Sequence, residues 1–378
     1  MSQTKVEAPF IQRNEIFRNK FCNGDFQVHQ RFDGSATAAS TAYMSFDRIK
    51  TLLINTGAAW TIEKETLSVT DLATTGHKQA LEVKCTTADT STGAAEYNAV
   101  FFSLEANSLQ DLNYGTSAAK SLTVSFWVRS YQTGTFILTA AKSDSTTYYN
   151  PKEYTINASN TWEHKVLTFS PTAGGTSLIT SSNGAIPNDN GQGMHFYFLL
   201  NAGSNYHATN DTWATSGIAT SNQTNMMSST DNHWSITGLQ IEVGDQATDF
   251  EYLPFDIQLQ RCLRYFFRDN LYTSGVGATG SIAAGQCNTT TRFDGQYDFP
   301  VLMRARPTGS VSGADKFRVQ HAGSTTTTTG VALEADGVAP SFKSTMIYAT
   351  VSSGLTAGRA GNLIHNNATA YIDNDAEF

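Results

Sequence analysis

Charged side chains are scarce in this chain, since Asp, Glu, Lys and Arg together make up 15% of its 378 residues, against roughly 25% in an average soluble protein. Ser, Thr, Asn and Gly take their place, so hydroxyl and amide groups form much of the surface. The net charge is −8 and the basic residues are scattered, which argues against nucleic acid as a partner. The composition also lacks the Ala, Glu, Lys and Leu enrichment of helical bundles.

Cysteine is rare as well, with four residues at Cys22, Cys85, Cys262 and Cys287. Their spacing includes no Cys-x-x-Cys and fits no zinc motif. The first 15 residues show no signal-peptide pattern, so four cysteines in a chain of this length favour reduced thiols over a disulfide framework. A Cys262–Cys287 disulfide stays open as an alternative.

Long apolar runs and catalytic motifs are missing too. No apolar run approaches 18 residues, so we expect no membrane insertion. The eight histidines form no HExxH, and neither GxSxG nor a phosphate-binding GxxxxGK[ST] occurs. The carboxylates are dispersed and mark no pair of the kind that cleaves glycosidic bonds. The sequence therefore predicts a protein that is not an enzyme.

What the chain does contain is aromatic bulk and strand patterns. It has 22 Phe and 15 Tyr, enough to build cores. Within 121–130, Leu122, Val124, Phe126 and Val128 alternate with more polar residues, as in a strand with one buried face. Similar runs lie at 81–85, 99–106, 135–142, 164–170, 194–203 and 233–244, separated by turn-forming residues. The pattern predicts an all-β protein built on a β-sandwich.

Composition and residue pattern divide the chain into four segments. Residues 1–20 are polar and predict an arm. Residues 21–254 hold the strands of the first β domain. Residues 255–269 predict a helical connector, because apolar side chains recur at helical spacing after Pro254. Residues 270–378 return to strands and turns and predict a second, small β-sandwich domain.

Several short motifs occur in a fixed order along residues 21–310. They are Asn23-Gly24-Asp25-Phe26 with Gln30-Arg31, then Ser125–Arg129, then Gly238–Gly244 with Ala247–Glu251, then Gln260–Phe266, and last Pro300–Thr308, where Val301 and Leu302 interrupt the pattern. In this order they resemble virion structural proteins of tailed bacteriophages, a group of tail fibres and carbohydrate-binding-module-like proteins.

The resemblance implies a jelly-roll first domain, similar to carbohydrate-binding modules, and a location in the virion after assembly in the host cytoplasm. It implies a tail fibre or other surface appendage that contributes to attachment to host-surface polysaccharide. A homo-oligomer, by analogy a trimer, would be anchored to other virion proteins by the N-terminal arm. A capsid decoration or head-fibre protein, and a carbohydrate-binding module of a glycan-active protein, remain alternatives.

The candidate binding residues lie mainly in a long polar loop, 204–232. Loops of this length are usually functional or form interfaces, and this one offers Trp213 as an exposed ring for a sugar or a neighbouring subunit. Its companions are Tyr206, His207, Asn210 and Asp211. Trp127, in the middle of an expected strand, is a further candidate if it lines an open sheet face.

We expect no cofactor, and a structural calcium ion stays open as an alternative. Jelly-roll modules often tie the first strand to the last through calcium, which prefers carboxylate and carbonyl oxygens. Asn23, Asp25 and Glu242 occupy the matching places in the resemblance, although the usual closing pair of aspartates is missing.

Overall fold

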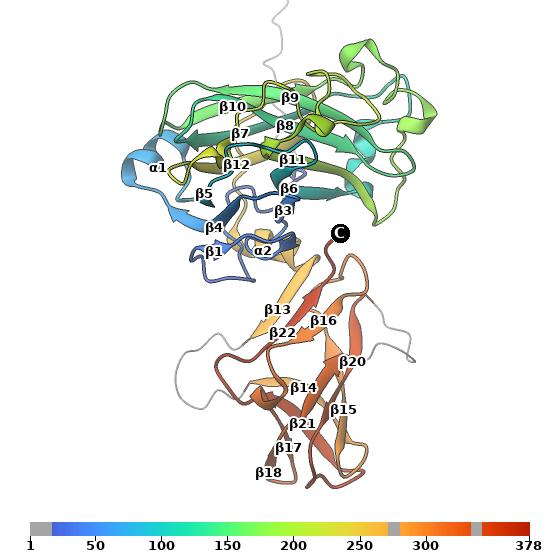
Figure 1. The fold of residues 1–378 in the computed structure, drawn as a ribbon. Helices are drawn as coiled ribbons and strands as arrows, with labels where there is room; N and C mark the ends of the chain where they lie inside the picture. The colour runs from blue at the N-terminus through green and yellow to red at the C-terminus, as the bar shows by residue number, and fades with distance from the viewer. Residues whose placement is uncertain (1–16, 271–279, 334–341) are drawn as a thin grey trace, which may run out of the picture.

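A computed structural model describes residues 17–270, 280–333 and 342–378 of the chain. Figure 1 shows two β-rich units, a broad sandwich above and a narrower body below, with helix α2 between them. All pairings between named strands in the described residues are antiparallel. The predicted all-β class, with a jelly-roll-like sandwich first, is confirmed.

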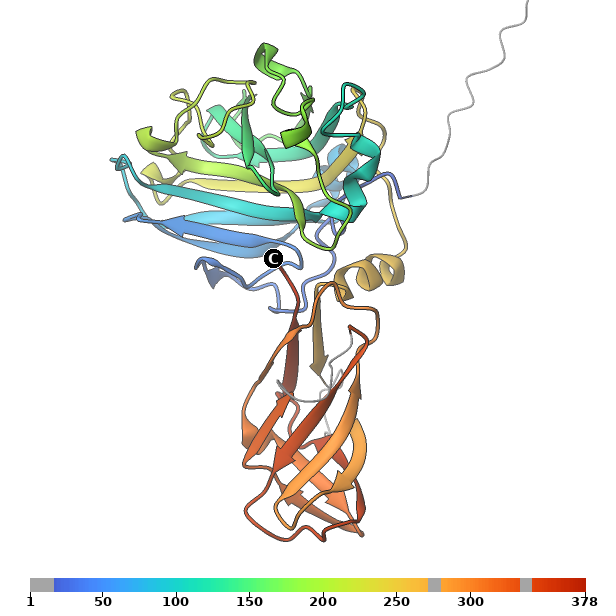
Figure 2. The same cartoon turned by 90° about the vertical axis from the view of Figure 1, so that its right-hand side faces the viewer.

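The first unit consists of two six-stranded sheets. The first sheet has the order β1 (Thr37–Ala38), β4 (Ala59–Thr66), β5 (Gln79–Thr87), β12 (His233–Val243), β7 (Leu122–Ser130) and β10 (Glu163–Phe169). The second sheet has the order β2 (Ala42–Tyr43), β3 (Lys50–Ile54), β6 (Tyr97–Glu105), β11 (Gln192–Ala202), β8 (Gly134–Lys142) and β9 (Tyr148–Ile156). Figure 2 shows the two layers from the side.

Alternation along the strands builds the core between these sheets. In β7, Phe126 and Val128 point inward and are fully buried, and in β11 Phe196 and Phe198 do the same from the opposite sheet. The rings of Phe126 and Phe198 meet edge to face with centroids 5.0 Å apart. The other faces of both sheets point away from this core.

The helices of the structure are short. They are α1 (Val69–Thr75), α2 (Phe255–Leu263) and the 3-10 turns η1 (Ala106–Leu112), η2 (Ala173–Gly175), η3 (Ser182–Gly184), η4 (Ser204–Tyr206), η5 (Met226–Ser228) and η6 (Ala314–Lys316). Within the described residues, no helix has the length and apolar character needed to cross a membrane.

The predicted connector, 255–269, holds α2 and then a strand. Pro254 precedes the helix as expected, but the chain leaves the helix after Leu263. From Phe266 it forms β13 (Phe266–Asn270), which pairs along its whole length with β22 (Tyr371–Asp375). Sheet pairing thus overrides the helical spacing of the last residues of this segment.

The second unit packs a three-stranded sheet against a seven-stranded one. The smaller sheet has the order β13, β22, β16 (Thr308–Val311). The larger has the order β18 (Ser324–Thr327), β17 (Phe317–His321), β21 (Ala360–His365), β14 (Ser281–Cys287), β15 (Arg292–Asp298), β20 (Ser344–Thr350) and β19 (Gly330–Leu333). Its separate core includes Phe293, Phe317 and Ile347.

Buried charges join the two units. Arg48 of the sandwich is 2% exposed and pairs with Glu377 at the end of the chain. Its guanidinium also lies 3.5 Å above the ring of Tyr265. Arg264 donates to Glu105 at the end of β6 (Nε–Oε2 2.9 Å). Because an unpaired buried charge is costly, these pairs hold both units in one arrangement.

Residues 1–16 of the predicted arm lie outside the described residues. Its last residues lie on the sandwich, where the Lys20 amide donates to the Ile241 carbonyl (2.8 Å). The Asn19 side chain donates to the Leu239 carbonyl (3.0 Å). This end of the arm therefore runs beside the last strand of the sandwich.

Candidate functional site

The outer face of the second sheet gathers aromatic side chains from strands that are far apart in sequence. The register places Phe101 of β6 opposite Tyr197 of β11, and His195 stands opposite Ala141 of β8, which in turn faces Tyr149 of β9. Directly opposite residues share a face. We call the surface formed by Tyr97, Phe101, Tyr149, His195, Tyr197 and Tyr206 the tyrosine face.

The rings of the tyrosine face touch one another. Phe101 and Tyr197 meet edge to face at 5.0 Å between centroids, and His195 lies 5.2 Å from Tyr197. Tyr149 lies 6.3 Å from His195. Phe101 and His195 are buried, whereas Tyr149 and Tyr197 are half-buried. The face thus has a packed aromatic floor from which tyrosine rings reach solvent.

The polar atoms of this face are uncharged hydrogen-bonding groups. Burial, together with Tyr149 and Tyr97, raises the pKa of Tyr197, so its hydroxyl stays protonated. Burial lowers the pKa of His195 to about 4, which keeps the imidazole neutral. Its Nδ1 lies 2.6 Å from the Ser143 hydroxyl, while its Nε2 has no partner among the described residues.

The long polar loop, 204–232, lies across part of the same sheet. Ala214 forms two backbone hydrogen bonds with Tyr149 (2.8 and 2.9 Å), and the buried Ile218 packs with Leu199 and Ile137 on the outer face. The loop therefore borders the tyrosine face along β8 and β9. The functional role of this loop stays a prediction, and the loop lies next to the candidate site.

Trp213 was expected to be an exposed ring, and that prediction is wrong. Its side chain is 1% exposed and belongs to the main core of the sandwich. The indole Nε1 donates to the Ser170 carbonyl (2.8 Å). The loop is polar, but it turns this one large residue inward and uses it as an anchor.

The neighbours of Trp213 have different roles. Asn210 accepts from the Glu153 amide (3.0 Å) and Asp211 pairs with Lys152 (2.8 Å), so both fasten the loop to β9. His207 is exposed at the loop surface. Tyr206 belongs to the tyrosine face, where its ring meets Tyr97 at 4.8 Å. Of the five predicted loop residues, Tyr206 is therefore the one that joins the aromatic surface.

Trp127 lies on the opposite side of the sandwich. It points outward from β7 in the first sheet, half-buried, with its ring 5.1 Å from that of His164. It packs beside Leu67 and Trp162 in a small cluster. The structure thus separates Trp127 from Tyr206 by the whole thickness of the sandwich.

The three expected calcium ligands make hydrogen bonds with protein groups. Asn23 Oδ1 accepts from the Val28 amide (2.8 Å). The Glu242 carboxylate accepts from the Thr248 amide (2.9 Å) and hydroxyl (2.6 Å), and Asp25 accepts from two glutamine side chains. Across residues 17–270, 280–333 and 342–378, no three His, Cys, Asp or Glu side chains form a metal-binding group. The calcium site stays a prediction.

A pair of acids lies on the outer face of the first sheet. Glu63 of β4 stands opposite Glu82 of β5, and such pairs have Cβ atoms about 5 Å apart. Burial and the nearby Glu65 raise the pKa of Glu82 to about 7. The ammonium group of Lys84 contacts both Glu63 and Glu82, so this pair is bridged by a cation.

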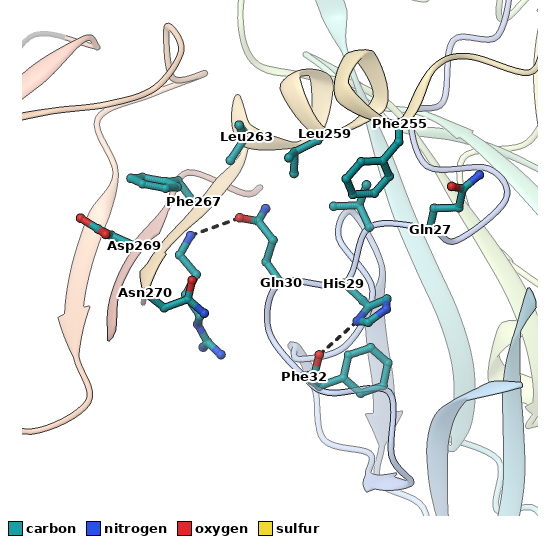
Figure 3. A pocket seen from close by; sticks show the side chains of 12 residues that line it. Gln27, His29, Gln30, Phe32, Phe255, Leu259, Leu263, Phe267, Asp269 and Asn270 are labelled. Carbon is teal, nitrogen blue, oxygen red and sulfur yellow. Dashed lines mark hydrogen bonds between the residues drawn. The ribbon is translucent and has the colours of Figure 1, made fainter. Parts of the chain in front are cut away.

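A separate hollow of about 500 Å³ lies at the junction of the two units (Figure 3). Leu259 and Leu263 of α2 form an apolar wall, and polar side chains from both units surround it. The Arg268 amide donates to the Gln30 side chain across the junction (3.3 Å). This hollow is therefore bounded by groups that connect the sandwich to the second unit.

One sign of the tyrosine face is visible in the amino-acid sequence. The segment 194–200 carries rings on both alternations, with Phe196 and Phe198 on one side and His195 and Tyr197 on the other. A strand of this kind has two aromatic faces, and only one can point into a single core. The aromatic side chains on the other face are then either covered by another segment or available to a ligand.

Comparison with known proteins shows only weak similarity. No family model and no curated protein match the sequence. Among solved structures, the enzymatically active domain of tailspike protein 4 of bacteriophage CBA120 overlaps 60% of this chain and 21% of its own, at 10% identity and TM-score 0.29. The CBM22-1 xylan-binding domain of Paenibacillus barcinonensis Xyn10C overlaps 57% of this chain and 97% of its own, at 12% identity and TM-score 0.28.

A family 11 carbohydrate-binding module of Clostridium thermocellum, solved with a mixed-linked tetrasaccharide, gives similar values. It overlaps 59% of this chain and 99% of its own, at 12% identity and TM-score 0.27. The overlap with the tailspike spans about a fifth of that protein. At such identities and TM-scores, the activities of these proteins do not transfer to this chain.

Proposed function

We propose that this chain is a non-enzymatic glycan-binding protein and that the tyrosine face is its sugar-binding surface. The single observation that supports this most is the set of half-buried tyrosines, Tyr97, Tyr149 and Tyr197, on an open sheet face. Flat rings pack against the apolar C–H faces of sugars, while phenol groups exchange hydrogen bonds with sugar hydroxyls.

The positions of the acids support binding without cleavage. Two acids lie on the outer face of the second sheet, Glu105 in β6 and Glu153 in β9. Through the strand pairing, Glu153 is level with Ala99 of β6. Ala99 and Glu105 are six positions apart along β6, which corresponds to roughly 20 Å at ~3.3 Å per residue. Glycosidases need two carboxyl groups within about 10 Å, and Glu105 is already paired with Arg264.

The phage part of the proposal rests on the motif order between residues 23 and 308. We propose that the protein is a surface appendage of a virion, such as a tail fibre, that contributes to attachment to the host. In this arrangement the N-terminal arm anchors the chain to another virion protein, and copies assemble as a homotrimer. Immunogold labelling of particles with antibodies to this chain tests the location, and unlabelled particles contradict it.

Affinity gel electrophoresis against a panel of bacterial capsular polysaccharides, O-antigens and plant glucans and xylans tests sugar binding. We expect retardation by at least one polysaccharide, and loss of that retardation in Tyr149→Ala/Tyr197→Ala. Tyr131→Ala is the matched control, because Tyr131 is exposed and directly follows β7, a strand of the other sheet. Equal retardation of both variants contradicts the assignment.

A reducing-end assay on the retarding polysaccharide separates binding from hydrolysis. We expect no release of reducing ends. If they are released and Glu82→Gln abolishes the release, the bridged acid pair on the first sheet is catalytic and the proposal of a non-enzymatic protein fails.

A further inference from the structure

Two cysteines that are 240 residues apart in sequence meet at the junction of the two units. Cys22 precedes the first turn of the sandwich, and Cys262 lies in the last turn of α2. Both belong to one small buried core with Val28 and Tyr265, where each thiol affects the pKa of the other. The Cys262–Cys287 pairing is excluded, because Cys287 belongs to the separate core of the second unit.

The two thiols differ in access. Cys22 is 7% exposed and lines a cavity of about 220 Å³, whereas Cys262 is 0% exposed behind it. The same cavity is lined by Arg48, Arg261 and Arg264. A small molecule that enters this cavity therefore meets the sulfur of Cys22 before that of Cys262.

The two thiols also differ in acidity. The neighbouring Cys262 thiol lowers the pKa of Cys22, and Arg48 and Arg261 act in the same direction against burial and Glu377. Burial raises the pKa of Cys262. Since the thiolate is the attacking form, the accessible thiol is also the one that ionises more readily.

We infer that Cys22 and Cys262 form a redox-active dithiol, which a small-molecule disulfide oxidises to an intramolecular disulfide. The Cys22 thiolate attacks one sulfur of the oxidant and releases one equivalent of small thiol. The Cys262 thiol then loses its proton and attacks Cys22, which releases the second equivalent. The two cysteines lose two electrons and two protons, and the oxidant gains them.

The resulting cross-link ties the start of the sandwich to α2. That helix leads directly into β13, the first strand of the second unit. The oxidised pair thus fixes the junction covalently, next to the Arg48–Glu377 contact, and a reductant reverses it. The site is independent of the tyrosine face and of the proposed sugar binding.

Peptide mapping by mass spectrometry, after incubation of the whole protein with 2-hydroxyethyl disulfide and an acid quench, tests the inference. We expect a Cys22–Cys262 cross-linked peptide in wild type, with Cys85 and Cys287 still free and the cross-link lost on addition of dithiothreitol. No cross-link, or faster reaction at Cys85 or Cys287, overturns it.

Single variants separate the two roles. Cys262→Ser should retain one mercaptoethanol adduct on Cys22, because the second attack is lost. Cys22→Ser should leave Cys262 unmodified, because the reagent cannot reach it. Cys85→Ser is the control and should cross-link as wild type does. A stable adduct on Cys22 in the wild-type protein contradicts the assignment of Cys262 as the second thiol.

Discussion

Trp213→Ala tests whether the polar loop is anchored through the sandwich core. The indole is 1% exposed, and a buried aromatic of this kind removes about 150–250 Å² from water. Truncation of a core Trp to Ala costs about 3–5 kcal/mol. The lost hydrogen bond to the Ser170 carbonyl is worth about 1 kcal/mol of this total. The free energy of unfolding should therefore fall by about 3–5 kcal/mol.

The assay is urea unfolding followed by far-UV circular dichroism. Trp213→Phe keeps most of the apolar contact and loses the indole N–H, so it should cost about 1–2 kcal/mol. Trp127→Ala is the control, since Trp127 is half-buried on an open sheet face, and should cost less than Trp213→Ala. A loss below about 1 kcal/mol for Trp213→Ala would show that the loop does not depend on this anchor.

Three further predictions concern the junction, pH and calcium. Arg48→Met leaves the buried Glu377 carboxylate with only its longer contact to Arg31 (3.7 Å) and should cost about 3–5 kcal/mol in urea unfolding; an unchanged midpoint would contradict a buried pair. The pKa of His195 is lowered from 6.5 to about 4 by burial, so the unfolded chain binds more protons in that interval and stability falls as the pH drops through it. His195→Gln should reduce the slope of unfolding free energy against pH there, and equal slopes would sink this explanation. EDTA should leave the Tm unchanged, because protein groups bind the oxygens of Asn23 and Glu242; a lower Tm that calcium restores would favour the calcium site.

The sheets could be predicted from the sequence because alternation is a local property. The pattern at 121–130 matches β7 (Leu122–Ser130), with Phe126 and Val128 in the core. The end of α2 could not be predicted in this way. Phe266 continues the helical spacing of Leu259, Cys262 and Leu263, but it begins a strand whose pairing depends on β22, about 100 residues later in the chain.

The tyrosine face could not be predicted as a site because it exists only after four strands pair. Its rings come from β6, β9 and β11 and from the loop after β11, and their proximity depends on the order β6-β11-β8-β9. The burial of Trp213 could not be predicted from the sequence for a related reason. The polar residues around it are typical of a surface loop, and only the packed structure shows that the ring turns inward.

A crystal structure of the protein with an oligosaccharide from the retarding polysaccharide tests the central claim most directly. We predict sugar rings stacked on Tyr149 or Tyr197. Sugar bound on the first sheet beside Trp127, or in the hollow at the junction, would contradict the account.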